Sequence, residues 1–103
     1  MLGDLEKDHL AALRKLQRAN ARAVWETLSK DRVIAYTTVS TTLDRLYKKG
    51  YVGRDVQEKR GGKNYVYHFK NLRARFANQL LDEFVHIFGN EAINTFVQEA
   101  KKR

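Results

Sequence analysis

The chain has 103 residues, a formal net charge of +8 and a pI near 9.9. A chain of this length forms one small domain, or one domain with an appended element, and its core is marginal unless a partner subunit adds to it. Because the sequence has no cysteine, disulfides, thiolate metal sites and thiol nucleophiles are excluded. No apolar run approaches the roughly 20 residues of a membrane span and the N-terminus lacks a secretory pattern, so we expect a cytoplasmic protein.

The positive charge is concentrated in the middle of the chain. Residues 31–70 contain nine Lys or Arg against four Asp or Glu, whereas residues 71–100 contain two against four. A basic surface attracts polyanions through its long-range field and through the release of counterions. We therefore expect nucleic acid to be the partner.

Two helices are predicted before residue 31. The first has apolar residues along one side, and His9 falls on that side. We expect His9 to be a core histidine, because no second ligand stands at a helical spacing from it. The second helix is predicted over Ala21–Lys30 with Asn20 as its cap. Trp25 lies on its apolar stripe, which predicts a core anchor and not a platform for bases.

The stretch AYTTVSTTLDRLYKKGYVGR has an ambiguous period. Its β-branched residues alternate as in a strand, yet Val39, Leu43 and Leu46 repeat at the spacing of one helix face. Lysines crowd its end, and Gly50 can adopt the left-handed conformation that closes a helix. We predict a helix at Thr37–Lys49, capped by one of its first two threonines.

Two short strands, YVGRDVQ and NYVYHF, are predicted to form a hairpin after this helix. The second strand alternates, with Tyr65, Tyr67 and Phe69 on one face. Gly61 and Gly62 are expected to supply the turn. The basic residues around the turn are Lys59, Arg60 and Lys63. A basic hairpin tip of this kind is either a solvated loop or an arm that touches phosphate.

The last third of the chain predicts two more helices, separated at Gly89, with Asn90 as the cap of the second. Large apolar residues recur at steps of four and three along the first and form a shorter stripe on the second. This much apolar surface needs a partner, either the first domain or the same helices of a second chain. The residues expected at a dimer interface are Phe76, Leu80, Phe84, Ile87, Phe88, Ile93, Phe96 and Val97.

The order of elements predicts a mostly α fold with a small antiparallel β-hairpin. It is the order of a winged helix-turn-helix domain, over residues 1–70, followed by C-terminal dimerisation helices over residues 71–103. In a recognition helix, short polar side chains approach base edges and longer cations reach phosphates. The expected DNA-binding residues are Thr37, Thr38, Ser40, Thr41, Arg45, Lys48 and Lys49 on the helix, and Arg60 and Lys63 in the wing at 58–63.

The pieces VWE, AYTTV, TTLDRL and KKGYV occur in register over nearly the first seventy residues. With LGDLEKDHLAAL before them and NYVYHF after them, they resemble the penicillinase-repressor (BlaI/MecI/CopY) group of winged-helix regulators. The resemblance implies a prokaryotic repressor that binds a palindromic operator as a homodimer. It also implies, for many relatives, inactivation by a membrane sensor protease. The matching bond here is Thr95–Phe96, where relatives commonly have asparagine before the phenylalanine.

Three other possibilities are weighed against a sequence-specific repressor: a nucleoid-type protein, a winged-helix module used for protein contact, and an enzyme. A nucleoid-type protein that coats DNA without sequence preference would use the same positive charge. An enzyme is disfavoured, because the histidines are scattered and no phosphate-binding glycine loop precedes a helix. Asp82 and His86 share a helix face, but two ligands without a third favour a surface ion pair over a metal site. We expect no cofactor and no metal.

Overall fold

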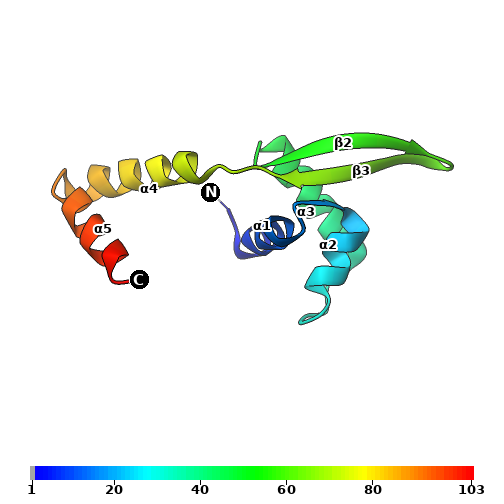
Figure 1. Cartoon of the computed structure of the whole chain (residues 1–103), viewed down its shortest axis with the longest axis horizontal. Helices are drawn as coiled ribbons and strands as arrows, with labels where there is room; N and C mark the ends of the chain where they lie inside the picture. Colours follow the sequence, from blue (N-terminus) through cyan, green and yellow to red (C-terminus); the bar gives the residue numbers. More distant parts are fainter. Residues whose placement is uncertain (1) are drawn as a thin grey trace. The chain divides into compact units, whose positions relative to one another are not determined.

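The computed structural model describes residues 2–103, which form five helices and three strands (Figure 1). The chain divides into two compact units, residues 1–70 and residues 71–103. The first unit contains α1, β1, α2, α3, β2 and β3, and the second contains α4 and α5. The two units are therefore described separately.

Helix α1 spans Asp4–Leu16, and a side chain of its first turn, Glu6, caps its N-terminus. An Oε1 atom of Glu6 accepts a hydrogen bond from the backbone N–H of Gly3 at 3.1 Å, which satisfies one of the free donors of the helix start. Ala12 and Leu13 on the apolar side of the helix are buried, and His9 is buried with them, as expected for a core histidine.

Helix α2 spans Ala21–Leu28 and ends two residues earlier than predicted. The predicted cap is present, because the Asn20 side chain accepts a hydrogen bond from the N–H of Ala23 at 2.9 Å. Trp25 packs against the core, and its indole N–H donates to the carbonyl of Ile34 at 2.8 Å. Trp25 thus holds the loop that leads from α2 into α3.

Helix α3 spans Tyr36–Lys48, and the period of its apolar residues is the one predicted. The predicted threonine cap is wrong. The N-cap is Ala35, which makes no side-chain cap bond, and its carbonyl accepts from the N–H groups of Thr38 and Val39. The first threonines therefore lie inside the first turn, where their side chains are free to face outward.

The end of α3 agrees with the prediction. Gly50 has φ +83°, the left-handed conformation. Its N–H donates to the carbonyl of Tyr47, and the next N–H, of Tyr51, donates to the carbonyl of Leu46, both at 2.9 Å. This pair of bonds is a Schellman motif, which satisfies two of the free carbonyls at the helix end. The chain then turns directly into the hairpin.

The sheet has three antiparallel strands in the order β1-β3-β2. Strand β1, Arg18–Asn20, was not expected from the sequence, because three residues are too few to display an alternating pattern. Strands β2 (Val52–Lys59) and β3 (Gly62–Phe69) are joined by two residues, so the predicted second turn glycine instead begins β3.

The two faces of β3 differ as predicted. Tyr67 is buried, and Tyr65 and Phe69 pack against the same core. On the other face, His68 lies opposite Gly53 in the register, and a Cβ on that glycine would meet the His68 ring at 1.8 Å. A glycine at this position therefore allows the histidine ring to lie over the strand.

The second unit consists of α4 (Arg73–Phe88) and α5 (Ala92–Lys101). Gly89, with φ +85°, ends α4 as predicted. The predicted cap at Asn90 is wrong, because the N-cap is Glu91 and it makes no side-chain cap bond. The ring of Phe84 packs against the ring of Phe88 at 5.2 Å and that of Phe96 at 6.3 Å. Within residues 2–103, no helix is long and apolar enough to cross a membrane.

Candidate nucleic-acid interface

The outward side of α3 carries small hydroxyl side chains over a fully buried apolar side. Val39, Leu43 and Leu46 are inaccessible to solvent and fix the helix against the core. Thr37, Thr38 and Thr41 are exposed and Ser40 is half-buried, so the structure brings these four predicted residues to the surface of one helix. Short side chains on a rigidly packed helix can come within hydrogen-bonding distance of base edges.

These threonines border a depression of about 280 Å³ on this face of the helix. Arg45 lines it one turn further along, and Leu5 of α1 contributes an apolar side. Thr42 also lines it, but its hydroxyl donates to the Thr38 carbonyl at 2.7 Å and the residue is buried. The depression thus combines methyl groups, free hydroxyls and one cation.

The three basic residues predicted on α3 differ in their partners. Arg45 is exposed and makes no hydrogen bond or ion pair with any residue of the described chain. Lys48 forms an exposed ion pair with Asp44 at 2.9 Å. Hydrogen bonds from Lys48 and then from Arg54 hold the pKa of Asp44 below its ordinary value. Lys49 forms an ion pair with Glu6 of α1. Of these three basic residues, Arg45 is therefore the one without an ion pair, and it is the best placed to bind an external ligand.

The ion pair of Lys49 is the most enclosed of these contacts. The ammonium group lies 2.9 Å and 3.2 Å from the two carboxylate oxygens of Glu6, a residue only 7% exposed. The N–H of Gly3 and then the Lys49 ammonium hold the pKa of Glu6 below its ordinary value. This contact joins the start of α1 to the end of α3, so the structure gives Lys49 a role in packing.

Replacing Lys49 by Ala should lower stability more than it lowers DNA affinity. The loss of free energy of unfolding should be about 1–2 kcal/mol, because the Glu6 carboxylate stays buried without its partner. Lys48→Ala is the matched control, and the loss of its exposed pair should cost about 0.3–0.5 kcal/mol. Urea unfolding at one fixed protein concentration measures both. Equal stability of the two variants would contradict this role.

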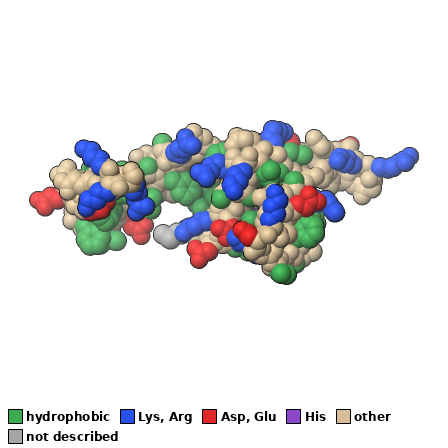
Figure 2. Space-filling model, turned by 60° about the horizontal axis from the view of Figure 1, so that its bottom comes forward, with side chains coloured by type: hydrophobic (Ala, Val, Ile, Leu, Met, Phe, Trp, Pro, Cys, Tyr) green, Lys and Arg blue, Asp and Glu red, His purple; other side chains and the backbone are tan. Residues whose placement is uncertain are grey.

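The hairpin tip carries the other predicted basic residues. Arg60 lies in the two-residue loop, Lys63 follows on β3, and both are exposed. Neither makes a hydrogen bond or ion pair with residues 2–103. In Figure 1, β2 and β3 extend together beyond the three helices of the first unit, and Figure 2 shows Lys and Arg side chains at the tip. Arg60 and Lys63 are thus accessible cations on a narrow arm, and Lys59 beside them is exposed as well.

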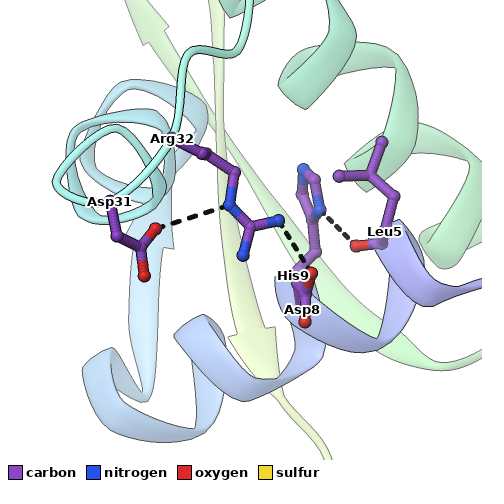
Figure 3. Close-up of polar contacts among 5 residues, drawn as sticks. All are labelled: Leu5, Asp8, His9, Asp31 and Arg32. Atoms are coloured by element: carbon purple, nitrogen blue, oxygen red, sulfur yellow. Dashed lines mark hydrogen bonds and ion pairs between the residues drawn. The ribbon is translucent and has the colours of Figure 1, made fainter.

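A polar cluster joins α1 to the loop before α3 (Figure 3). It could not be predicted from the sequence, because these two segments are far apart along the chain. Arg32, in the loop between α2 and α3, donates to Asp8 of α1 at 2.7 Å and lies 3.4 Å from Asp31. Asp8 supplies the leading hydrogen bond that raises the pKa of Arg32. The cluster fixes the loop that precedes α3.

His9 lies beside this cluster and is fully buried (Figure 3). Its Nδ1 lies 2.7 Å from the carbonyl oxygen of Leu5, which fits a neutral ring that donates from Nδ1. Its Nε2 is buried and has no hydrogen-bond partner. Burial therefore lowers the pKa of His9 from the usual 6.5, although the Leu5 carbonyl opposes this.

Stability should fall on acidification in two stages. The pKa of His9 is lower in the folded chain than the usual 6.5, so the unfolded chain binds more protons and stability is lost as pH falls below about 6.5. The pKa of Glu6 is also lowered, so its contribution is lost as pH falls from 4.5 through its folded value. Unfolding measured from pH 7 to pH 3 should show the first stage disappear in His9→Gln and the second remain. A wild-type curve that is flat between pH 7 and pH 5 would contradict this.

The apolar residues predicted at a dimer interface lie on α4 and α5 of the second unit. Phe76 and Phe84 are half-buried, whereas Ile87 is 61% and Phe88 is 66% exposed. Phe84 and Phe88 also line a pocket with Glu91, Ala92 and Thr95. The other exposed members of the set are Leu80, Ile93, Phe96 and Val97. Figure 2 shows hydrophobic side chains gathered on these helices.

No group of three or more potential metal ligands occurs in the described part of the chain. Asp82 and His86 are both exposed on α4. The geometry therefore gives this pair no third ligand within residues 2–103.

The comparison with protein families gives a match over nearly the whole chain. The profile of the penicillinase repressor family matches residues 2–103, which confirms the resemblance that the sequence motifs indicated. That family consists of transcription regulators and not of enzymes, so the expectation of a transcription regulator is confirmed. No curated protein sequence is significantly similar to the chain.

Solved structures share the fold at low identity. An hsRosR complex is 20% identical, covering 98% of this chain and 93% of that chain, with a TM-score of 0.60. A PadR family transcription regulator from hypervirulent Clostridium difficile is 16% identical, covering 92% and 99%, with a TM-score of 0.58. A mutant MarR from E. coli complexed with operator DNA is 19% identical, covering 98% and 74%, with a TM-score of 0.58. These likenesses confirm the predicted winged-helix fold.

Proposed function

Because the chain belongs to the penicillinase repressor family, we propose that this winged-helix transcriptional regulator is a sequence-specific repressor that binds a pseudo-palindromic operator as a homodimer. Helix α3 enters the major groove, and the hairpin β2–β3 is the wing that lies on the DNA backbone. Residues 1–70 form the DNA-binding domain, and residues 71–103 form the dimerisation region.

The observation that carries the proposal is the pairing pattern of the cations near α3. Lys48 and Lys49 form ion pairs with carboxylates, whereas Arg45 lies beside the exposed threonines and makes no hydrogen bond or ion pair within residues 2–103. An unpaired Arg can make a bidentate contact with the O6 and N7 atoms of guanine. The threonine methyl groups beside it, at Thr37 and Thr41, can pack on thymine methyl groups. This combination supports reading of bases by α3.

The wing supports contact with phosphates. Arg60 and Lys63 are exposed at its tip and free of ion pairs within residues 2–103. Phosphate contacts of this kind position a protein on the duplex and carry no sequence information. Arg60→Ala should therefore weaken binding to all duplexes alike and flatten the dependence of affinity on salt.

The exposed apolar side of α4 and α5 supports the homodimer. Six large apolar side chains are at least 40% exposed on two short helices, a surface that a second copy of the same helices can cover. A two-fold dimer places its recognition helices about 34 Å apart, one turn of duplex. The operator is therefore expected to have two inverted half-sites.

Selection of bound duplexes from a random pool tests the proposal. The enriched sites should show two-fold symmetry, with half-site centres separated by about one helical turn or a multiple of it. Binding to the enriched site should exceed binding to random duplexes by ~10³ or more at physiological salt. A flat profile across the pool would instead favour a nucleoid-type protein that coats DNA through its charge. A site without symmetry would contradict the homodimer.

Regulation by a protease is a separate part of the resemblance. The matching bond, Thr95–Phe96, lies in the middle of helix α5. Preferred sites of proteolytic nicking are exposed loop tips. A protease acting at this bond would therefore have to unwind α5 first.

A further inference from the structure

Arg54, the third residue of β2, binds α3 and β3 at the same time. Its guanidinium donates to the Asp44 carboxylate of α3 at 2.9 Å. It also lies over two aromatic rings, 3.9 Å from the centre of Tyr47 on α3 and 4.1 Å from the centre of Tyr65 on β3. The side chain is only 17% exposed. One cation thus joins three elements at the root of the hairpin.

The chemistry of this cluster makes it stiff. A guanidinium that lies over two aromatic rings and is also paired with Asp44 has little freedom to move. A cation held over an aromatic ring is attracted by the negative face of the ring, and more strongly when the site is shielded from water. A neighbouring ion pair, between Arg18 and Asp55, is short at 2.6 Å but more than half exposed. That pair should contribute little by comparison.

The direction of the outer part of the hairpin is set where β2 and β3 leave the domain, near Arg54. Strand β1 pairs with β3 only from Val66 to His68, so the pairs from Val56 outward belong to β2 and β3 alone. From Arg54 to Lys59 the strand advances about 17 Å at ~3.4 Å per residue, so a change of 10–20° at the root moves the tip by ~3–6 Å. Such a displacement exceeds the tolerance of a hydrogen bond to phosphate.

We propose that Arg54 is a positioning residue, which sets the angle between the wing and the recognition helix so that the wing tip reaches phosphates while α3 occupies the major groove. This inference rests on the proposed function. Arg54 itself does not contact DNA, because its guanidinium is engaged by Asp44, Tyr47 and Tyr65. Its effect on binding is transmitted through Arg60 and Lys63 at the tip.

A double-mutant cycle tests the proposal. The slope of log affinity against log salt is measured with the full chain and its selected operator, for wild type, Arg60→Ala, Arg54→Met and the double variant. In the wild-type background, Arg60→Ala should reduce the magnitude of the slope by ~0.9, the value of one phosphate contact. In the Arg54→Met background, the same change should reduce it by less than half as much, because the tip is already displaced.

Arg18→Ala is the matched control, because it also removes one cation from the sheet, at an exposed position. In that background Arg60→Ala should have its full wild-type effect. Every variant is measured at a temperature at which circular dichroism shows it to be folded. If Arg54→Met does not fold, Tyr65→Leu, which removes one of the two rings, takes its place in the cycle.

The outcomes separate this inference from the proposed function. If Arg60→Ala changes the slope equally in both backgrounds, Arg54 does not position the wing, while the wing contact of the proposed function stands. If Arg60→Ala has no effect in the wild-type background, the wing does not contact phosphate and both are overturned. A smaller effect in the Arg54→Met background alone, with the Arg18→Ala background unchanged, supports the positioning role.

Discussion

A chain with Ile87→Asp should be a monomer in solution and should bind the selected operator ~10²–10⁴-fold more weakly than wild type, because it loses the avidity of two linked DNA-binding domains. Ile87 is 61% exposed on α4, so the new carboxylate costs the isolated unit little. In a dimer the same carboxylate would be buried without a partner, which is strongly unfavourable.

The matched control for this prediction is Gln98→Asp. At 100° per residue, Gln98 lies on the side of α5 opposite Phe96, so the same charge is added away from the apolar side. Sedimentation equilibrium should give a dimer for wild type and Gln98→Asp and a monomer for Ile87→Asp. Binding to a duplex with a single half-site should be the same for all three. A dimeric Ile87→Asp with full operator affinity would place the dimer interface elsewhere.

The sequence predicted the parts of the fold that rest on local spacing. The apolar residues of α3 repeat at helical intervals, and Gly50 closes the helix in the expected conformation. The predicted caps at Thr37 or Thr38 and at Asn90 were wrong, because these helices begin with backbone hydrogen bonds alone. Strand β1 could not be predicted, since its three residues form a strand only by pairing with β3.

The sequence predicted which residues of the candidate site are exposed, but not which of its basic residues form ion pairs. The exposed threonines follow from the position of the buried face of α3, which a helical projection gives directly. The partner of Lys49, however, is Glu6, 43 residues away, and no spacing rule connects them. Arg54 was not singled out at all, because its partners come from α3 and β3 and meet only in the folded chain.

The net charge of +8 does not show which cations are free to bind DNA. In the first unit, the ion pairs of the described residues engage Lys7, Arg18, Arg22, Arg32, Lys48, Lys49 and Arg54. Some of these ion pairs join different elements of the domain, and others are exposed pairs within one helix. Arg45 on α3 and the basic residues at the wing tip make no ion pair within residues 2–103. This agrees with the proposed division, in which α3 reads bases and the wing contacts phosphates.

Arg45→Ala should weaken operator binding by about 1–3 kcal/mol per half-site, and by about twice that for a dimer that occupies both. It should also relax the preference for one base pair in each half-site, at positions related by the two-fold axis. The physical reason is that Arg45 is exposed beside Thr41 and makes no hydrogen bond or ion pair within residues 2–103, so its guanidinium can form a bidentate contact with a base edge.

Arg45→Lys separates base reading from charge. Lysine keeps the positive charge but not the planar fork, so the base preference should be lost as in Arg45→Ala while the salt dependence stays close to wild type. The measurement is the affinity for the operator and for each of its single-base variants, at several salt concentrations. Lys48→Ala serves as the control on the same helix, because its loss should lower affinity for all variants by one common factor. If Arg45→Ala also weakens every variant by one common factor, Arg45 contacts the backbone, and base reading must rest on the threonines of α3.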